Sequence, residues 1–526
     1  MISRQPGQIS ENSKGTAGNT LNNQRIAKNT LVLYVRMFLM MAVSLFTSRI
    51  ILQVLGVEDF GVYNVVGGII SMFAFINGGM VSATQRYITF EIGTGNKAKL
   101  RSVFSTSLQI HAAIALLVVA LGETVGLWFL LEKMVIPEGR MTAAVWVYQC
   151  SIIASVVNIM SIPYNADIVA HEKMSAFAYI SIVEVILKLL IVYLLMFSPC
   201  DKLIVYAVLI LLVQLSIRFI YAGYCKRHFE ESSYRNSFDK PLLREMAGFA
   251  GWSFWGNLAG ILYTQGLNIL LNVFFGPVVN AARGIAVQVQ SAVQQFVTNF
   301  QMALNPQITK SYAIGELDQM HSLMFRSARF SFFLLFFITL PVLLETDFLL
   351  GVWLKDVPEN AVVFTRIMIC ISLIYTTASP CVIANQATGK VKVYQIVVGG
   401  ILLMILPISY IVLKLGAPPY SVFIVHFCVE SIAQCARMLM LRNLIGLPMG
   451  QYMKNIYLPV AATVAVSVIL PVFVHNQFDV GWLRFVVVGF TCVLSVGFSV
   501  FALGLSKHER SFLIEKTISV LRSGKS

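Results

Sequence analysis

The sequence predicts an all-α integral membrane protein with about 14 transmembrane helices, arranged as two six-helix lobes related by a parallel repeat and followed by two extra C-terminal helices. Three observations lead to this fold class. The composition is too apolar for a soluble protein, apolar segments of spanning length follow one another along the chain, and the first six of them resemble the next six.

Of the 526 residues, 57% are hydrophobic and only 12% are charged, whereas soluble domains carry about 25% charged residues. A soluble protein could not bury so many apolar residues over its whole length. The composition therefore excludes a water-soluble enzyme, a nucleic-acid-binding protein and a disordered scaffold. The eight cysteines show no spacing typical of a metal or redox site, so we expect no metal and no cofactor.

A spanning helix needs about 20 mostly apolar residues. On that criterion the sequence predicts spans at residues 31–55, 61–88, 103–130, 141–169, 177–198, 203–225, 247–275, 278–309, 326–353, 360–387, 392–414, 419–445, 455–475 and 481–505. These give an N-lobe at 31–225, a C-lobe at 247–446 and two further helices within 447–505. The polar segments predict a disordered tail at 1–30, a linker at 226–246 and a second tail at 506–526.

Lys and Arg gather in the tails and in the even-numbered loops, with clusters at 97–101, 226–244 and 507–525. Because basic residues are retained on the cytoplasmic side, both tails and the linker are predicted to be cytoplasmic. The net charge of +14 is thus a topological feature, and no nucleic-acid partner is expected. Four tryptophans at the predicted outer helix ends fit an interfacial belt, namely Trp128, Trp146, Trp353 and Trp482.

An internal repeat relates helices one to six with helices seven to twelve at a shift of about 220 residues. The matched positions are Leu55-Gly56 with Phe275-Gly276, Ile92-Gly93 with Ile314-Gly315, Pro137-Glu138 with Pro358-Glu359, Pro163 with Pro380, Ala170 with Ala387, Lys173 with Lys390, and Arg218 with Arg437. Six helices is an even number, so both halves start on the same face and the repeat is parallel. Two similar lobes are what alternating access requires, which favours a transporter.

Charged side chains inside the membrane are costly and predict function. Arg36 and Arg49 both lie on the first predicted helix, and guanidinium groups bind phosphate with bidentate geometry. The alternative is that both extend towards the two interfaces. We take them as candidates for binding a phosphate group in a central cavity.

Amide side chains are dense on the seventh and eighth predicted helices. The candidates for a wall that binds sugar hydroxyls are Asn257, Asn268, Asn272, Gln288, Gln295 and Asn299. The alternative is that these amides hold helices together.

Other intramembrane charges are open to two interpretations. Glu184 and Lys188 stand four residues apart and predict a structural ion pair. His426 and Glu430 on the twelfth helix are a candidate coupling site for H⁺ or Na⁺, the alternative being that Glu430 pairs with Arg437. No P-loop is visible in the sequence, so ATP hydrolysis is not expected.

The segment LGVEDFGVYNVVGGI from Leu55, SATQRYITFEIG from Ser82 and RIAKNTLVLYVR from Arg25 together resemble Wzx-like polysaccharide flippases of the multidrug/oligosaccharidyl-lipid/polysaccharide exporter superfamily. The resemblance covers essentially the whole chain. It implies a non-enzymatic, multi-pass protein of the bacterial inner membrane that flips undecaprenyl-pyrophosphate-linked oligosaccharide, the repeat unit of O-antigen, capsule or exopolysaccharide. It also implies a cationic cavity, for which Arg36, Arg49, Arg86 and Arg283 are the candidates.

The implied partners are the lipid-linked oligosaccharide, membrane lipids, and a polysaccharide polymerase or glycosyltransferases. Two other functions stay open at this point. A cation-coupled multidrug antiporter of the same fold needs an unpaired carboxylate in the membrane, for which Glu430 is the best candidate. An integral-membrane glycosyltransferase or polymerase is disfavoured by the repeat and the short loops.

Overall fold

The computed structural model describes residues 29–40, 75–132, 139–233, 239–275, 277–354, 357–507, 509–511 and 514–515, together with residues 43, 47, 50, 51, 54, 55, 59, 62, 63, 66 and 136. Every regular element among them is a helix, which confirms the predicted all-α class.

An apolar helix at Asn29–Met40 comes first. The helices that follow are α2 (Phe75–Thr94), α3 (Lys97–Leu121), α4 (Leu127–Glu132), α5 (Met141–Ala170), α6 (Met174–Phe197), α7 (Lys202–His228), α8 (Lys240–Phe275), α9 (Pro277–Ala313), α10 (Leu317–Leu344), α11 (Thr346–Leu354), α12 (Ala361–Thr388), α13 (Val391–Leu403), α14 (Ile405–Lys414), α15 (Ser421–Ile445), α16 (Met449–Tyr452), α17 (Leu458–His475) and α18 (Trp482–Ser499). Short helical turns lie at η2 (Gly122–Gly126), η3 (Glu230–Ser232), η4 (Met453–Tyr457) and η5 (Val500–Gly504).

Within the described residues, 11 helical segments are long and apolar enough to cross a membrane, so the chain is a multi-pass membrane protein. The predicted spans 31–55 and 61–88 lie partly outside the described residues, and Asn29–Met40 and α2 are their described parts. The predicted span 278–309 is α9, a helix of 37 residues. Its length of about 55 Å is enough to cross a bilayer, but its many amides make it too polar to count among the apolar segments.

The chain divides into two compact units. Unit 1 is Met1–Asn257 with Met302–Ile314, and unit 2 is Leu258–Gln301 with Gly315–Ser526. Two helices therefore belong to both units, because α8 passes from unit 1 to unit 2 after Asn257 and α9 passes back after Gln301. The predicted lobe boundaries stay a prediction.

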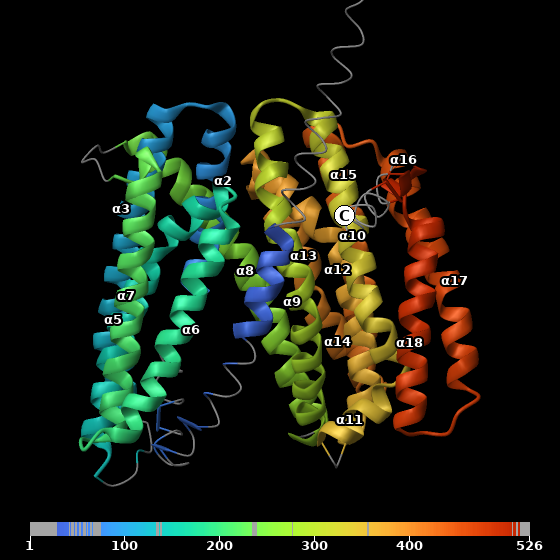
Figure 1. Cartoon of the computed structure of the whole chain (residues 1–526), viewed down its shortest axis with the longest axis horizontal. Helices are drawn as coiled ribbons and strands as arrows, with labels where there is room; N and C mark the ends of the chain where they lie inside the picture. The colour runs from blue at the N-terminus through green and yellow to red at the C-terminus, as the bar shows by residue number, and fades with distance from the viewer. Residues whose placement is uncertain are drawn as a thin grey trace, which may run out of the picture. The chain divides into compact units, whose positions relative to one another are not determined.

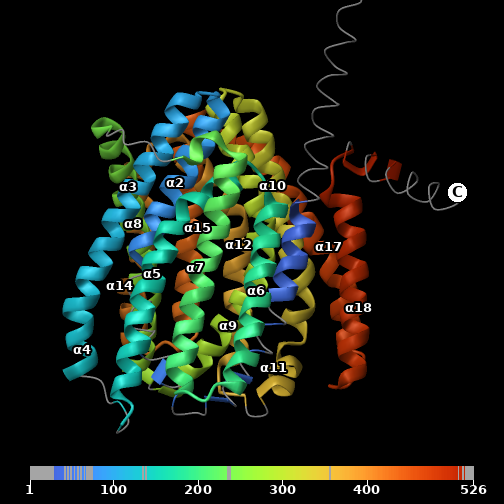
Figure 2. The same ribbon diagram turned by 60° about the vertical axis from the view of Figure 1, so that its left-hand side comes forward.

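Unit 1 is built around α5, which packs against α2, α3 and α7, while α6 covers α7 (Figures 1 and 2). The side chains of Val147, Tyr148 and Ile152 on α5 form a buried core with Leu203 and Ala207 on α7. The Tyr148 hydroxyl satisfies the carbonyl of Gly122 at 2.6 Å, where η2 interrupts the helical ladder. Burial on both sides of α5 explains why this helix has no distinct apolar face in the sequence.

Unit 2 repeats this packing around α12, which contacts α10 on one side and α15 on the other, with α13 and α14 against α15. Its core holds Phe364 and Phe423, whose ring centroids are 4.7 Å apart. The order α10, α12, α15 thus corresponds to α3, α5, α7, as the predicted repeat requires. Pro163 inside α5 and Pro380 inside α12 occupy equivalent positions.

Three backbone positions with a left-handed conformation also recur at equivalent places in the two halves. The pairs are Gly95 with Gly315, Gly139 with Asn360, and Glu172 with Gly389, each about 220 residues apart. Only glycine adopts positive φ without strain, so these sharp helix ends are a shared feature of the repeat. They also correct one match made from the sequence, because Gly315 corresponds to Gly95, whereas Gly93 lies inside α2 against Ala313.

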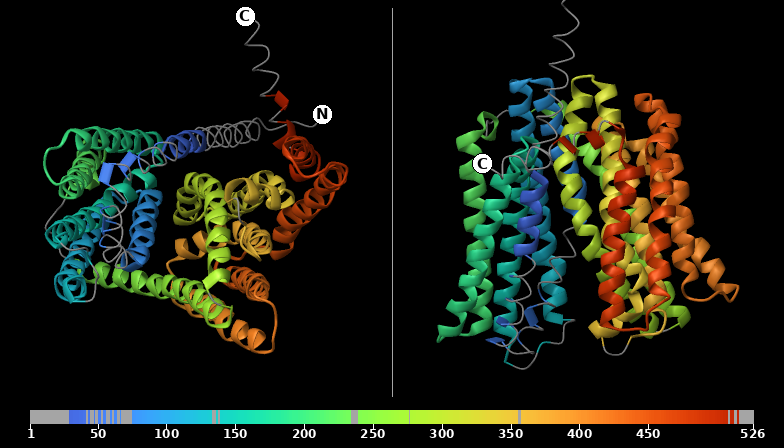
Figure 3. Two further views of the ribbon diagram at one scale, coloured as in Figure 1. Left: turned by 90° about the horizontal axis from the view of Figure 1, so that it is seen from below. Right: turned by 45° about the vertical axis from the view of Figure 1, so that its right-hand side comes forward.

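The two helices outside the repeat, α17 and α18, lie side by side and pack on α10, and they form the pair at the red end of the colour bar in Figures 1 and 3. The fully buried carboxylate of Glu345, between α10 and α11, fastens them. It accepts from Nδ1 of His475 at 2.9 Å and from Arg484 at 3.0 Å. The four belt tryptophans are each half exposed or more.

Candidate functional site

The helix α9 carries a polar stripe on the surface of unit 2. Gln288, Ser291, Gln295 and Thr298 are all exposed and follow one another at intervals of three or four residues, with the exposed Gly284 at the start. This spacing places them on one face of the helix. Amide and hydroxyl groups are unfavourable against hydrocarbon, so this face is suited to a wet surface. We call these five residues the α9 stripe.

The other predicted wall residues are placed differently. Asn257 on α8 is exposed, in unit 1, and Asn268 is half-buried, in unit 2. Asn299 does not share the exposure of the α9 stripe, because its side chain is buried and its amide donates to the carbonyl of Gln295 at 3.0 Å. The side chain of Asn272 lies outside the described residues.

The interior of unit 2 holds Arg283, which is buried on α9 and donates from one terminal nitrogen to the carbonyl of Thr264 at 2.8 Å. Its Nε has no hydrogen-bond partner. His426 on α15 packs edge-on against the ring of Tyr263, with centroids 5.2 Å apart. A buried guanidinium with a donor to spare is suited to binding an anion or a ligand carbonyl.

Glu430 is paired rather than available. Both it and Arg437 are almost fully buried, and Arg437 donates to the Glu430 carboxylate at 2.7 Å and to the hydroxyl of Tyr394 at 3.2 Å. Of the two interpretations weighed from the sequence, the structure therefore contains the ion pair with Arg437. Glu184 and Lys188 likewise form the predicted pair, at 2.6 Å.

The predicted arginines of unit 1 lie in two separate settings. Arg36, on Asn29–Met40, donates from Nε to Ser181 at 2.9 Å and stacks 4.5 Å above the ring of Phe177, both on α6. Arg86, on α2, lies over the rings of its neighbours Tyr87 and Phe90. Arg49 lies outside the described residues. The ring contacts hold both guanidinium groups by cation–π attraction.

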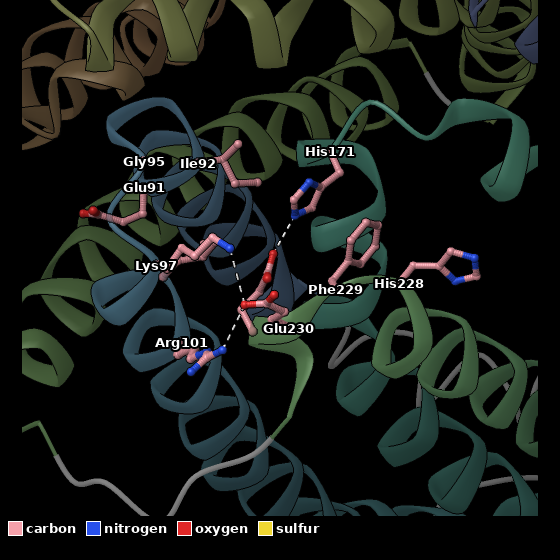
Figure 4. A pocket seen from close by; sticks show the side chains of 11 residues that line it. Glu91, Ile92, Gly95, Lys97, Arg101, His171, His228, Phe229 and Glu230 are labelled. Atoms are coloured by element: carbon pink, nitrogen blue, oxygen red, sulfur yellow. Dashed lines mark hydrogen bonds and ion pairs between the residues drawn. The ribbon is translucent and has the colours of Figure 1, made fainter.

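Sequence reasoning missed a polar pocket at the end of unit 1 that carries the turn between α2 and α3. It has a volume of about 310 Å³ and is lined by Glu91, Ile92, Gly95, Lys97, Leu100, Arg101, His171, His228, Phe229, Glu230 and Glu231. In Figure 4, Lys97 and Arg101 reach towards Glu230, and His171 points into the pocket. The signals in the sequence were the spacing of four between Asp167 and His171 and the acidic pair at 230–231.

The two acidic residues of this pocket differ in their partners. Glu230 is exposed and pairs with Arg101 at 3.1 Å, whereas Glu231 is buried and lies 2.5 Å from Nε2 of His171. Burial on its own raises the pKa of the Glu231 carboxyl, but the interactions with His171, a backbone hydrogen bond and the charge of Arg101 together outweigh that effect and hold this pKa below its ordinary value.

Residues 26–312 match the family model described as polysaccharide biosynthesis protein. Among solved structures, one titled as MATE in the bent conformation aligns with 82% of this chain and 97% of its own, at 12% identity and a TM-score of 0.71. An outward-facing multidrug resistance MATE family transporter of the MOP superfamily aligns with 80% and 96%, at 14% identity and a TM-score of 0.66.

A third solved structure is a MOP superfamily transporter from Pyrococcus furiosus, described as having a binding pocket of reversed polarity. It aligns with 80% of this chain and 96% of its own, at 15% identity and a TM-score of 0.61. At such identities these likenesses show a shared fold. No curated protein matches the sequence at a significant level.

Proposed function

The chain belongs to the polysaccharide biosynthesis protein family, and from this premise we propose that it is a flippase for undecaprenyl-pyrophosphate-linked oligosaccharide. It moves this lipid from the cytoplasmic to the periplasmic leaflet of the bacterial inner membrane by alternating access. Glycosyltransferases that complete the repeat unit act before it, and a polysaccharide polymerase consumes its product.

The α9 stripe is the observation that carries this proposal. A glycan presents many hydroxyl groups and little charge, and amides donate and accept hydrogen bonds with such groups. The stripe runs over about four helical turns on an exposed face of unit 2, which is long enough for several sugar residues. Because α9 continues into unit 1 after Gln301, the helix that carries the stripe is shared by both moving parts of an alternating-access transporter.

The pyrophosphate needs cations, and each unit offers one candidate, Arg36 in unit 1 and Arg283 in unit 2. The Nε bond of Arg36 to Ser181 and its stacking on Phe177 fix the guanidinium group while leaving its terminal nitrogens for a ligand. The buried Arg283 has an Nε without a partner. A cation-coupled multidrug antiporter, the other function considered, needs an unpaired carboxylate, and Glu430 is bonded to Arg437.

The test compares variants in a strain that lacks the chromosomal copy. We expect the Gln288→Leu, Gln295→Leu double variant, at normal levels in the membrane, to lose surface glycan and accumulate complete lipid-linked repeat units. Those units should be protected from an impermeant glycosidase added to spheroplasts, which distinguishes failed flipping from failed polymerisation. The matched control is Ser431→Leu, a half-buried position on α15 whose hydroxyl bonds only within its own helix.

Full surface glycan in the double variant would refute the assignment of the α9 stripe. Truncated repeat units in the deletion strain would indicate a transferase. An unchanged lipid profile with altered sensitivity to cationic dyes would indicate the drug antiporter.

A further inference from the structure

Three metal-ligating side chains converge beside the pocket of unit 1. Asp167 lies on the last turn of α5, His171 is the residue that caps this helix, and Glu231 lies in η3. One ligand atom from each lies within 4.8 Å of the other two. Nε2 of His171 is 2.5 Å from Glu231 and 3.6 Å from Oδ1 of Asp167.

The Asp167 carboxylate is only half satisfied. Its side chain is fully buried, and its Oδ2 accepts from the hydroxyl of Ser232 at 2.5 Å. Its Oδ1 has no hydrogen-bond partner and points to the same space as Nε2 of His171. A buried carboxylate oxygen without a partner costs free energy unless something else binds it.

The imidazole is held in the orientation that a ligand needs. Its ring stacks on Phe229, with centroids 4.1 Å apart and planes only 7° from parallel. This stacking directs Nε2 towards the two carboxylates, so the three ligand atoms are set by the end of α5, by the cap residue and by η3 together.

The second half of the repeat shows that packing does not require these groups. At the shift that relates Pro163 with Pro380, the equivalents of Asp167 and His171 are Ala384 and Thr388. Ala384 is fully buried, so an apolar side chain fills the same position in unit 2. The packing that the two halves share therefore does not need the charged residues, which indicates that they bind a ligand.

We propose that Asp167, His171 and Glu231 bind a divalent transition-metal ion. One imidazole nitrogen and two carboxylate oxygens form the donor set that Zn²⁺ and Mn²⁺ accept, whereas Mg²⁺ and Ca²⁺ prefer oxygen ligands alone. Three protein ligands leave at least one coordination position for water or another ligand, and the 310 Å³ pocket that His171 and Glu231 line provides the room. The ion fastens the end of α5 to the segment that joins the two halves of the repeat.

Glu230 provides a matched control because it differs from Glu231 only in its surroundings. It is the neighbouring residue and lines the same pocket, yet its carboxylate pairs with Lys97 and Arg101 and is absent from the ligand set. A general loss of negative charge in the pocket would affect both glutamates equally, whereas a site with defined ligands would respond to Glu231 alone.

The experiment uses the full chain, purified in detergent without a polyhistidine tag and stripped with a chelator. Mn²⁺ and Zn²⁺ are added, and binding is measured by calorimetry and by elemental analysis after desalting. We expect one ion per chain. Asp167→Asn and Glu231→Gln should each weaken binding by about tenfold or more, since even residues behind the ligands contribute that much, while Glu230→Gln should bind like the parent.

Electron spin echo spectroscopy of the Mn²⁺ form adds a readout that folding defects cannot imitate. We expect a modulation from a coordinated ¹⁴N that His171→Gln abolishes while the protein stays monodisperse. The proposal is overturned if the parent chain binds neither ion, if Glu230→Gln weakens binding as much as Glu231→Gln, or if the nitrogen modulation persists without His171.

Discussion

Variants of the buried ion pair between Glu430 and Arg437 can distinguish a structural role of this pair from a role in ion coupling. Both side chains are less than 5% exposed, and the Arg437 guanidinium also donates to Tyr394. Replacing Arg437 with Met leaves a carboxylate buried without a counter-charge. Replacing Glu430 with Gln leaves the guanidinium without its anion, although the amide oxygen still accepts one hydrogen bond.

The magnitude follows from the burial of the two groups. Breaking a buried pair from one side costs about 3–5 kcal/mol, whereas replacing both partners with neutral residues of similar volume costs little. A folding unit of about 150–250 residues loses about 2–4 °C of its melting temperature per kcal/mol. We therefore expect Arg437→Met to lower the melting temperature by roughly 6–20 °C, Glu430→Gln to lower it less, and the double variant to recover most of the loss.

The assay is the melting of the detergent-purified chain, followed by the fraction that remains monodisperse, at one heating rate because unfolding of such proteins is irreversible. The same variants are scored for surface glycan. If Glu430→Gln leaves the melting temperature unchanged but abolishes transport, the carboxylate serves ion coupling and the structural reasoning is refuted. Equal losses in both single variants and in the double variant would show that the two residues do not interact.

Two further predictions concern helix ends and helix contacts. The pKa of the Asp201 carboxyl is raised by burial but lowered more by the bonds from Arg140 and from the amides at the start of α7, so it lies below its ordinary value near 3.8. The stability from this group is therefore fully present above pH 3.8 and is lost as the pH falls through the lower value of the folded state. Asp201→Asn should melt lower than the parent at pH 7 and converge with it in acid, and a difference that persisted in acid would contradict the assignment. Gly93→Ala should destabilise the chain by about 1–3 kcal/mol, because the added Cβ would lie 2.7 Å from a facing side chain of α9. The control Gly284→Ala, with nothing within 4 Å, should melt at or above the parent temperature, and equal melting of both variants would contradict the close contact.

Most of the fold could be predicted from the sequence because a membrane span can be recognised from its apolar composition and its length alone. The apolar length of α5 or α12 needs no knowledge of its neighbours, and the spacing of Pro163 and Pro380 exposed the repeat. The register between α2 and α9 could not be predicted, because the sequence alone does not tell which of the two glycines, Gly93 or Gly95, contacts α9. Only the positive φ of Gly95 and the close packing of Gly93 distinguish them.

The candidate site was predictable where a single helix determines it. The α9 stripe follows from spacing along α9, so Gln288 and Gln295 could be placed on one face from the sequence. The burial of Asn299 and the pairing of Glu430 depend on what other helices bring, which spacing along one helix cannot reveal. The pocket of unit 1 was missed for the same reason, since Asp167 and Glu231 are separated by the whole of α6 and α7.

Differences between the two halves of the repeat identify the residues that the scaffold does not need. At the left-handed position after α12 stands Gly389, whereas after α5 stands Glu172, which accepts that strained backbone conformation. Its carboxylate binds Lys310 at 2.8 Å, and its carbonyl accepts from the side chain of Asn29 at 3.4 Å. Glutamate in place of glycine here ties the end of α9 and the first described helix to the turn after α5. The first half therefore bears extra charged contacts at the same end of unit 1 as the proposed metal site, whereas the equivalent positions in the second half are Ala384, Thr388 and Gly389. An ion bound at that site would strengthen the attachment of α5, and α9 is bound to the same turn through Glu172. The polar stripe proposed to meet the glycan thus belongs to a helix whose other end is held in unit 1 by the contact of Lys310 with Glu172.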